Sequence, residues 1–389
     1  MRVGVKKSYY AHCIMKTGFI YTDAYFDYDY GPAHPLKIVR LKLTFELIKA
    51  YGLLDLPSVQ TIITNRAEED DLATFHSREY LNMLKQANDG HLGGDAYAYG
   101  LGPGDNPIFP GLYDWSLWST GATLQAVDFV ANGEGDIAFN IAGGLHHAMR
   151  SRASGFCYIN DPVIGILRLL ERGKRVAYVD IDAHHGDGVQ KAFYQTNKVL
   201  TISLHETGYT LFPGSGFEYE IGEGEGEGYA VNLPLPPYTD DETYLWAFDE
   251  IVPPLIHTFK PDVVVTQLGV DSFYNDSLTN LHLTIYGYEK VLRRIKDLAP
   301  QWVALGGGGY DVSNVARAWT IAWAVMNGIE LSDELPESYL KKAAKLEIYE
   351  KTLRSGPKSA SSRESKDIRM EVERIVNYLK KTVFPKVLK

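Results

Sequence analysis

Three carboxylates and two imidazoles lie within eight residues, where an apolar run ends. Residues 180–187 read Asp-Ile-Asp-Ala-His-His-Gly-Asp. Buried charges cost free energy unless they are paired or bind a metal. A strand that ends in Asp-x-Asp-x-His therefore predicts a divalent ion held by oxygen and nitrogen. Because alternate side chains of a strand share one face, Asp182 and His184 can reach the same ion.

Alternating strands and helices must position this cluster. Short apolar segments predict strands buried on both faces, at 137–141, 175–181, 199–204, 263–268 and 302–305. Helical patterns lie between them at 162–172, 241–259 and 285–298. This alternation predicts one α/β domain with a mostly parallel central sheet and helices on both faces. Polar or glycine-rich residues follow each predicted strand, and sites of such sheets form at the carboxyl ends of the strands. One shared site is therefore expected there.

Composition predicts a cytoplasmic globular protein. The chain has 389 residues, 45% hydrophobic and 23% charged, which is typical of globular domains. Cys13 and Cys157 are too few for a disulfide framework and fit a reducing compartment. The N-terminus lacks the apolar core of a signal peptide. No run approaches the roughly 18 apolar residues of a membrane span.

The charge is acidic and unevenly spread. The net charge of −10 argues against direct nucleic-acid binding. Residues 351–389 hold eleven Lys/Arg and four Asp/Glu, a net +7, so the rest of the chain carries −17. The acidic body favours a cationic substrate such as a lysine-rich peptide, or it serves solubility alone. Both interpretations stay open.

Five motifs follow one another along the chain in a set order. They are GGLHH at 143–147, GFCY at 155–158, DIDAHHGDG at 180–188, QLGVD at 267–271 and GGGGY at 306–310. In this order they resemble the zinc-dependent histone deacetylases over roughly residues 15–330. The resemblance is greatest to the class I type and to bacterial acetoin-utilisation proteins, which the region around His34 and Arg40 also resembles. It implies an arginase/deacetylase fold and hydrolysis of the ε-amide of acetyl-lysine in proteins.

The resemblance implies a metal site of three residues. Asp182, His184 and Asp271 would hold zinc, which leaves a position for water and substrate as in catalytic zinc sites. Such an oxygen-rich set of ligands also suits iron(II) or another divalent ion, and the ligand types alone do not identify the metal.

The resemblance also implies the groups that move protons and stabilise charge. Amide hydrolysis needs a base for water and an acid for the leaving amine. His147 would serve as both, with His146 as its electrostatic partner. Asp180 would pair with His146 and Asp187 with His147, which fixes each tautomer and raises basicity. Tyr310, which follows four glycines, would donate a hydrogen bond to the developing oxyanion.

A substrate channel is implied next to these groups. Phe156, beside Gly155, and Phe212 would line a tunnel for the aliphatic stem of the acyl-lysine. Asp105 would bind substrate backbone amides at the rim. Leu278 stands where polyamine-selective relatives carry a glutamate, so an apolar residue there indicates acyl-lysine.

Family members bind potassium near the catalytic metal, so K⁺ is a second implied cofactor. The residues matching the first site are Asp180, Asp182, His184, Ser203 and Leu204. Those matching a second site are Phe193, Thr196, Val199 and Tyr229.

We predict a catalytic domain at 1–350, a polar linker at 351–366 and a basic terminal helix at 367–389. The basic tail lies outside the resemblance. Helical spacing in this segment predicts one apolar face, which packs on the body or forms an oligomer contact. The residues of this face are Met370, Val372, Ile375, Val376 and Leu379. An acetylated protein is the expected partner, acetyl-CoA synthetase by analogy with bacterial relatives or a histone-like protein.

Competing functions are weighed by the same motifs. A dinuclear manganese ureohydrolase needs Asp-Ala-His-x-Asp, which the spacing from His184 to Asp187 breaks. A non-catalytic acyl-lysine reader would not need the complete metal, His and Tyr set. Deacetylation of acetylpolyamines or other small amides on the same fold stays an alternative. A Cys157 nucleophile would leave the carboxylates without a role, and residues 306–309 lack the Lys-Ser/Thr of a phosphate loop.

Overall fold

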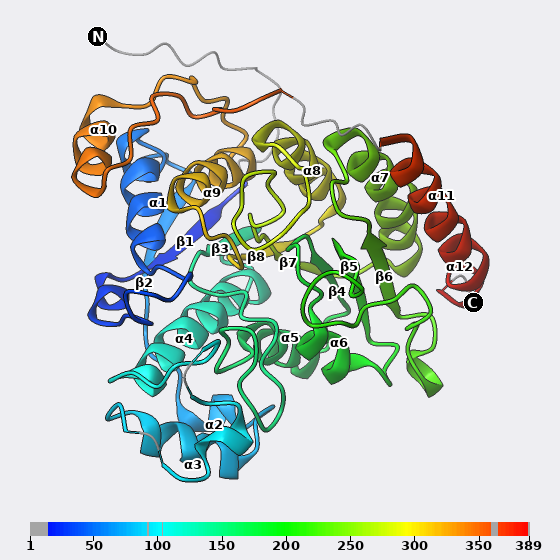
Figure 1. Ribbon diagram of the computed structural model, residues 1–389, viewed down its shortest axis with the longest axis horizontal. Coiled ribbons are helices and arrows are strands. Elements are labelled where there is room, and N and C mark those ends of the chain that lie inside the picture. The colour runs from blue at the N-terminus through cyan, green and yellow to red at the C-terminus, as the bar shows by residue number, and fades with distance from the viewer. Residues whose placement is uncertain (1–14, 92, 103, 359–364, 388–389) are drawn as a thin grey trace.

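An eight-stranded parallel sheet forms the centre of the computed structural model, which describes residues 15–387 apart from 92, 103 and 359–364. The strand order is β2-β1-β3-β8-β7-β4-β5-β6, and each neighbouring pair is parallel (Figure 1). The strands are β1 (Thr17–Tyr21), β2 (Val59–Ile63), β3 (Ile137–Asn140), β4 (Val176–Asp180), β5 (Val199–Glu206), β6 (Ala230–Leu235), β7 (Val263–Gln267) and β8 (Trp302–Leu305).

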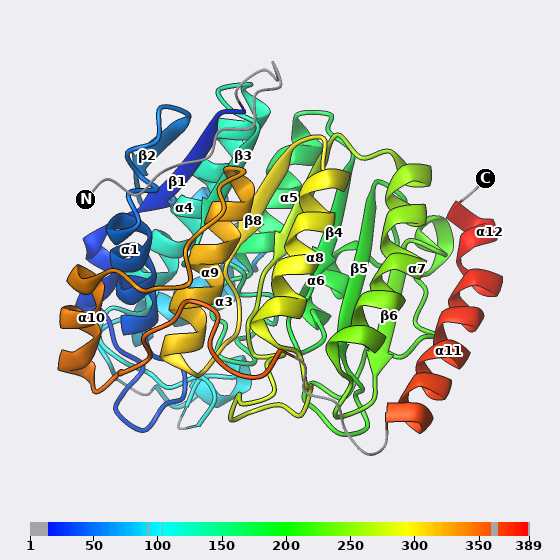
Figure 2. The ribbon, with the colours of Figure 1, turned by 90° about the horizontal axis from the view of Figure 1, so that it is seen from above.

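Helices cover both faces of this sheet, which confirms the predicted architecture. Helices α1, α9, α8 and α7 lie in a row on one face, and α4, α5 and α6 cover the other (Figures 1 and 2). The helices are α1 (Val39–Ala50), α2 (Glu69–Leu72), α3 (Arg78–Ala87), α4 (Leu112–Ala131), α5 (Asp161–Glu171), α6 (Asp187–Phe193), α7 (Asp241–Phe259), α8 (Ile285–Leu298), α9 (Val312–Met326), α10 (Glu337–Ala343), α11 (Ser365–Thr382) and α12 (Phe384–Val387). Short 3₁₀ turns lie at Asp23–Asp27, Ala96–Tyr99, Gly224–Gly226 and Ala344–Leu346.

Buried aromatic residues fill the space between the sheet and α9. Trp319 and Trp323 of α9 are fully buried. The Trp323 ring lies 5.2 Å from that of Phe19 on β1 and 6.4 Å from that of Phe139 on β3. Such large apolar rings contribute strongly to core stability, so they anchor α9 on β1 and β3.

Strand boundaries differ from the predictions where pairing overrides local pattern. Strand β5 continues through Glu206, because it pairs with β6 along its whole carboxyl half. Strand β6 runs through Pro234. Proline cannot donate to a neighbouring strand, but β6 is at the sheet edge, where that loss is tolerated.

The C-terminal helix packs on the body beside α7 (Figure 2). It starts at Ser365, inside the predicted linker. The prediction for its apolar face is wrong for Met370, which is 60% exposed. Met370 follows buried Ile368 by two residues, and two residues of a helix turn by roughly 200°, so its side chain points away from the body. The other four predicted residues of this face are buried. Within the predicted linker, Leu353 is buried and Arg354 pairs with Glu289.

Cys157 is a free, buried cysteine, and Cys13 lies outside the described residues. In the part of the chain that the structure describes, none of the helices combines the length and apolar character needed to cross a membrane.

Candidate active site

The site forms where β4, β7 and β8 end side by side. Asp180 is the last residue of β4 and pairs in register with Gln267, the last residue of β7. Gln267 in turn pairs with Leu305 at the end of β8. The segments that continue from these three strands carry the Asp/His cluster, Asp271 and the glycines before Tyr310.

Asp182, His184 and Asp271 meet as a potential metal-binding group. Their ligand atoms all lie within 4.8 Å of one another, and all three residues are buried. His184 Nδ1 is 3.1 Å from Asp182 Oδ1 and 3.0 Å from Asp271 Oδ2. The two outward carboxylate oxygens already accept hydrogen bonds, Asp182 Oδ2 from Gln267 and Gly308 and Asp271 Oδ1 from Ala183. Asp182 Oδ1, which also accepts the His184 N–H at 2.9 Å, and Asp271 Oδ2 lie beside His184 Nδ1, where the three atoms could share an ion.

The electrostatics of this group fit a cation. Burial alone would lower the pKa of His184, but hydrogen bonds and charges from Asp182 and Asp271 raise it to about 10. Burial and the neighbouring Asp182 raise the pKa of Asp271 to about 7. Two buried carboxylates this close repel one another unless a positive charge lies between them. The donor set of two oxygens and one nitrogen suits zinc, iron(II) or a similar ion.

Gly308 makes room for this group, which yields a prediction. A Cβ at Gly308 would collide with Asp271 Oδ2 and lie 2.7 Å from Asp182 Oδ2. We therefore expect Gly308→Ala to weaken divalent-ion affinity about 10- to 100-fold, as disturbed ligand support does elsewhere. A competition titration with a chromogenic chelator measures this. Gly93→Ala, where a Cβ meets nothing within 4 Å, should leave the affinity unchanged; equal affinities for the two variants would contradict the prediction.

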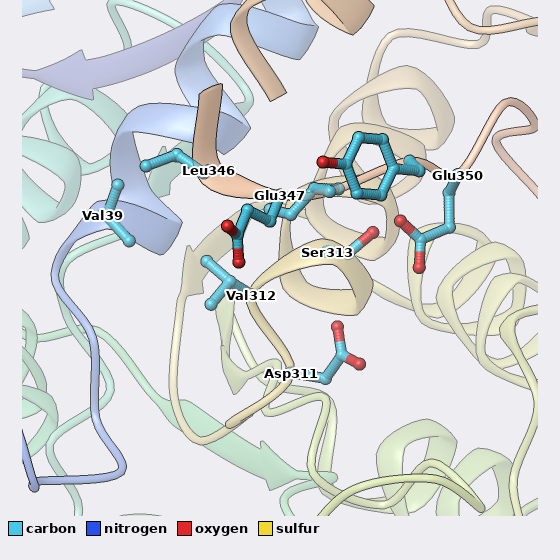
Figure 3. A pocket seen from close by; sticks show the side chains of 9 residues that line it. Val39, Asp311, Val312, Ser313, Leu346, Glu347 and Glu350 are labelled. Carbon is cyan, nitrogen blue, oxygen red and sulfur yellow. The ribbon is translucent and has the colours of Figure 1, made fainter. Parts of the chain in front are cut away.

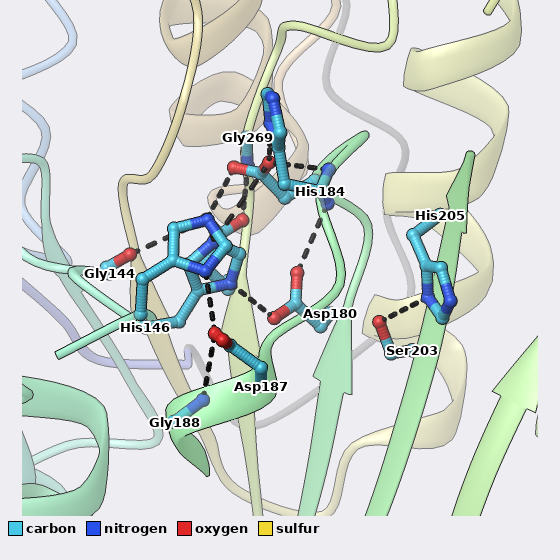
Figure 4. Close-up of polar contacts among 12 residues, drawn as sticks. Gly144, His146, Asp180, His184, Asp187, Gly188, Ser203, His205 and Gly269 are labelled. Atoms are coloured by element: carbon cyan, nitrogen blue, oxygen red, sulfur yellow. Dashed lines mark hydrogen bonds and ion pairs between the residues drawn. The ribbon is translucent and has the colours of Figure 1, made fainter. Parts of the chain in front are cut away.

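The two adjacent histidines each pair with a separate aspartate (Figure 4). His146 Nδ1 donates to Asp180 Oδ2 at 2.7 Å, and His147 Nδ1 donates to Asp187 Oδ1 at 2.7 Å. The two Nε2 atoms are 3.0 Å apart. Asp187 is the first residue of α6, and Asp180 also accepts a hydrogen bond from the Tyr178 hydroxyl. The predicted pairings are therefore the ones that the structure brings together.

Their surroundings push the pKa values of the two histidines apart. Burial favours neutral His146, but the charges of Asp180 and Asp182 outweigh it and raise the pKa to about 9. A cation bound beside Asp182 would weaken that contribution. Burial and the positive charge of His146 lower the pKa of His147 to about 4. His147 is thus the neutral member, and its unprotonated Nε2 faces Nε2 of His146 at 3.0 Å.

Buried polar residues that the sequence analysis did not select support this loop. Asn160 donates from its amide to the carbonyl oxygens of His146 and Ala148, at 3.1 and 2.9 Å. Asp161 accepts the backbone N–H groups of Gly144 and Leu145. The Asn-Asp-Pro sequence at 160–162 is a recognisable helix start, but nothing local shows that the same side chains also hold the histidine loop.

His76 anchors the same region and gives it a pH dependence. Its Nδ1 donates to the Arg150 carbonyl and its Nε2 accepts the Asn160 N–H, at 3.2 and 3.0 Å. Burial lowers the pKa of His76 to about 3. In the unfolded chain it is near 6.5, so the unfolded state binds this proton first as the pH falls.

The free energy of unfolding should therefore decline below about pH 6.5. From His76 alone we expect a loss of about 2 kcal/mol between pH 7 and pH 5. His76→Gln removes this titration and should flatten the decline in urea unfolding measured at the two pH values. His91→Gln, at an exposed position, should keep the wild-type decline. A decline as steep in His76→Gln as in the wild type would refute the assignment.

A cavity of about 210 Å³ reaches His184 of the metal group, and all five predicted substrate residues line it. Its lining comprises Asp105, His147, Gly155, Phe156, His184, Leu211, Phe212, Leu278 and Tyr310. Gly155 has a φ of +51°, and a Cβ there would collide with the His147 ring. Tyr310 lies edge-on to both Phe156 and His184, at centroid distances of 5.7 and 6.5 Å. Asp105, Phe212 and Leu278 are exposed, as expected at a mouth.

A larger cavity of about 700 Å³ lies outside this site (Figure 3). Its walls include Val39, Val312 and Leu346, with Asp311 and Glu350 among the polar residues. None of the predicted site residues lines it. Size alone therefore does not locate the chemistry.

The residues predicted for potassium fall into two places. Asp180, the last residue of β4, is the register partner of Ser203, which lies within β5. Phe193 ends α6 and Val199 starts β5, at the opposite end of that strand. Ser203 Oγ is 2.8 Å from His205 Nδ1 (Figure 4). Potassium binding at either place stays a prediction.

The parallel sheet, the buried Asp-His-Asp group and the two His-Asp pairs define a metal-dependent hydrolase of the α/β class. The histone deacetylase domain matches residues 34–326, so the chain belongs to the histone deacetylase family. It is 40% identical over 333 residues to the acetoin utilization protein AcuC of Bacillus subtilis, covering 83% of this chain and 85% of that protein. Histone deacetylase B of Dictyostelium discoideum is 41% identical over 312 residues, covering 80% of this chain and 73% of that protein.

A solved structure confirms the fold. The crystal structure of a histone deacetylase homologue from Aquifex aeolicus matches with a TM-score of 0.83 and 35% identity. The match covers 92% of this chain and all of that one. The resemblance inferred from the motifs is therefore confirmed, together with the arginase/deacetylase-type fold. The family is metal-dependent, in agreement with the Asp-His-Asp group.

Proposed function

We propose that this protein hydrolyses the acetyl amide of N6-acetyl-lysine in proteins. The observation that carries the proposal is the 210 Å³ cavity, which joins two phenylalanines at its walls to His147, His184 and Tyr310. Rings on either side suit an unbranched aliphatic stem, so the acetamide would reach the polar end. Leu278 at the mouth adds no charge to attract the second amine of a polyamine.

The site residues divide the chemistry as follows. Asp182, His184 and Asp271 would hold a divalent ion, which is zinc in this proposal. The chemistry supplied by such an ion is polarisation of the amide carbonyl and a lower pKa for a water molecule. Neutral His147 takes the proton of the attacking water at Nε2, and Asp187 stabilises the resulting imidazolium. His147 then returns that proton to the leaving lysine amine. His146 stays paired with Asp180 and contributes charge rather than a proton.

Tyr310 supplies the remaining stabilisation. Burial, with Asp271 and Asp182 nearby, holds the pKa of its phenol well above the usual value. The hydroxyl therefore stays protonated and donates to the oxyanion that develops on the amide carbonyl. Asp105, exposed at the mouth, would accept hydrogen bonds from substrate backbone amides.

The partner that this proposal implies is an acetylated protein. Acetyl-CoA synthetase and histone-like proteins are the candidates, in a reducing cytoplasm that suits the free thiol of Cys157. Potassium would bind at the two sites described above.

Hydrolysis of a fluorogenic acetyl-lysine peptide by metal-reconstituted protein tests the proposal. Wild type should release acetate, and both His147→Ala and Asp182→Ala should lower the rate of release on the order of 1,000-fold. Release at close to the wild-type rate in either variant would refute the assigned roles. Absence of turnover in protein with one bound ion per chain would refute acetyl-lysine as the substrate, and acetylpolyamines or longer acyl groups would be assayed next.

A further inference from the structure

Asp276 lies next to Tyr310 and is outside the set of residues selected from the sequence. It follows Asp271 by five residues and is only 9% exposed. Its Oδ2 accepts the backbone N–H of Tyr310 at 2.9 Å, and its Oδ1 accepts the backbone N–H of Leu278 at 3.0 Å. Tyr310 and Leu278 both line the 210 Å³ cavity. One buried carboxylate therefore joins the backbone at two points of the cavity wall.

The segment before Tyr310 needs such an external anchor. Residues 306–309 are all glycine, with φ values of +135° at Gly307 and +130° at Gly309. Glycine restricts its own backbone least, so the sequence of this segment does not fix the direction of the tyrosine. Besides Asp276, Asp182 accepts the Gly308 N–H at 2.8 Å and Arg40 donates to the Gly309 carbonyl at 2.9 Å. Among these hydrogen bonds of the described residues, the one that the Asp276 carboxylate accepts is made by Tyr310 itself.

Asp276 is itself held in place. Its backbone N–H donates to the Phe273 carbonyl at 2.9 Å. The adjacent Asn275 accepts a hydrogen bond at 2.9 Å from the side chain of Asn314, in the first turn of α9. A carboxylate on a segment held at its own N–H and at the preceding residue can fix the position of the groups that it binds.

We propose that Asp276 is a positioning residue that fixes the backbone of Tyr310, and through it the reach of the phenol hydroxyl to the reacting carbonyl. The inference rests on the proposed function above, in which Tyr310 stabilises the oxyanion. Because both carboxylate oxygens accept N–H groups, no neutral amide can replace them: an asparagine offers one acceptor and turns an N–H₂ toward the second donor.

The kinetic test uses Asp276→Asn. A misplacement of about 1 Å can cost up to about 100-fold in rate, so we expect kcat for an acetyl-lysine peptide to fall about 10- to 100-fold, with KM changed less than about 3-fold. In a Tyr310→Phe background the same substitution should change kcat less than about 2-fold, because the hydroxyl that it misplaces is already gone. Equal effects in both backgrounds would overturn the proposal. Asp276→Ser, which retains one acceptor, replaces the asparagine variant in this cycle if that variant does not fold.

A second readout does not depend on turnover. Hydrogen–deuterium exchange of the segment 306–312, followed by mass spectrometry, reports the Tyr310 amide directly. The exchange should accelerate in Asp276→Asn, and unchanged exchange would overturn the proposal even if the wild type proves inactive on acetyl-lysine. Inactivity with accelerated exchange would instead count against the proposed function and leave the positioning contact supported.

Asp241→Asn is the matched control. Asp241 is also a buried carboxylate, and it accepts the Thr284 N–H at 2.8 Å and its hydroxyl at 2.5 Å, between α7 and α8. Losing it should lower the midpoint of thermal unfolding while kcat and exchange in 306–312 stay at wild-type values. A kcat loss in this variant as large as in Asp276→Asn would reduce the role of Asp276 to general stability.

Discussion

Tyr310→Phe should reduce kcat for an acetyl-lysine peptide about 100- to 1,000-fold. Removal of one donor to an oxyanion has a cost of this size, because the hydrogen bond is strong only when negative charge has developed in a site sheltered from water. The phenol contributes little to binding of the uncharged acetamide, so KM should change by less than about 3-fold. Steady-state kinetics of the variant, with metal content matched to wild type, measure both constants.

Tyr349→Phe provides the control for this prediction. Tyr349 is 70% exposed and lines the separate 700 Å³ cavity. Loss of its hydroxyl should leave both constants unchanged. A Tyr310→Phe variant with higher KM and unchanged kcat would show that the phenol serves substrate binding instead of the reaction.

Removal of the divalent ion should have the second large effect. A chelator should abolish turnover, and one equivalent of zinc per chain should restore it. Asp182→Ala should bind the ion weakly and lose on the order of 1,000-fold in kcat/KM, since a metal contributes several kcal/mol to stabilising the developing charge. The measurements are metal content by elemental analysis and turnover before and after reconstitution.

Two results would contradict this prediction. Full activity in metal-free protein would exclude a role for the Asp-His-Asp group in catalysis. Restoration that requires two equivalents of manganese would favour the dinuclear alternative. Asp70→Ala, at a surface carboxylate paired with Arg78, controls for a general effect of removing negative charge and should bind zinc as wild type does.

Local signals determined the secondary structure where a helix carries its own start. Helices α7 and α8 have the predicted bounds. Asp240 accepts the N–H of Thr243, and Thr284 accepts that of Gly287, so each helix is capped by a side chain only three residues away. Strand ends were less predictable, as β5 shows, because pairing with a neighbour decides where a strand stops.

The sequence alone also determined which residues meet at the metal group. Asp182 and His184 share one strand end, and their periodicity puts them on one face. Asp271 follows a different strand, and the family resemblance connected it to the other two. The same holds for the pairing of His146 with Asp180 and of His147 with Asp187.

Only the tertiary structure decided what holds these groups in position. Asp276, Asn160 and His76 bind backbone atoms of the site from segments far away in the chain. Their partners are N–H and carbonyl groups, which every residue carries, so no residue type in the sequence marks the contact. The chemistry of the site is encoded in side-chain identity, which is local. Its geometry is encoded in long-range backbone contacts, which exist only once the chain has folded.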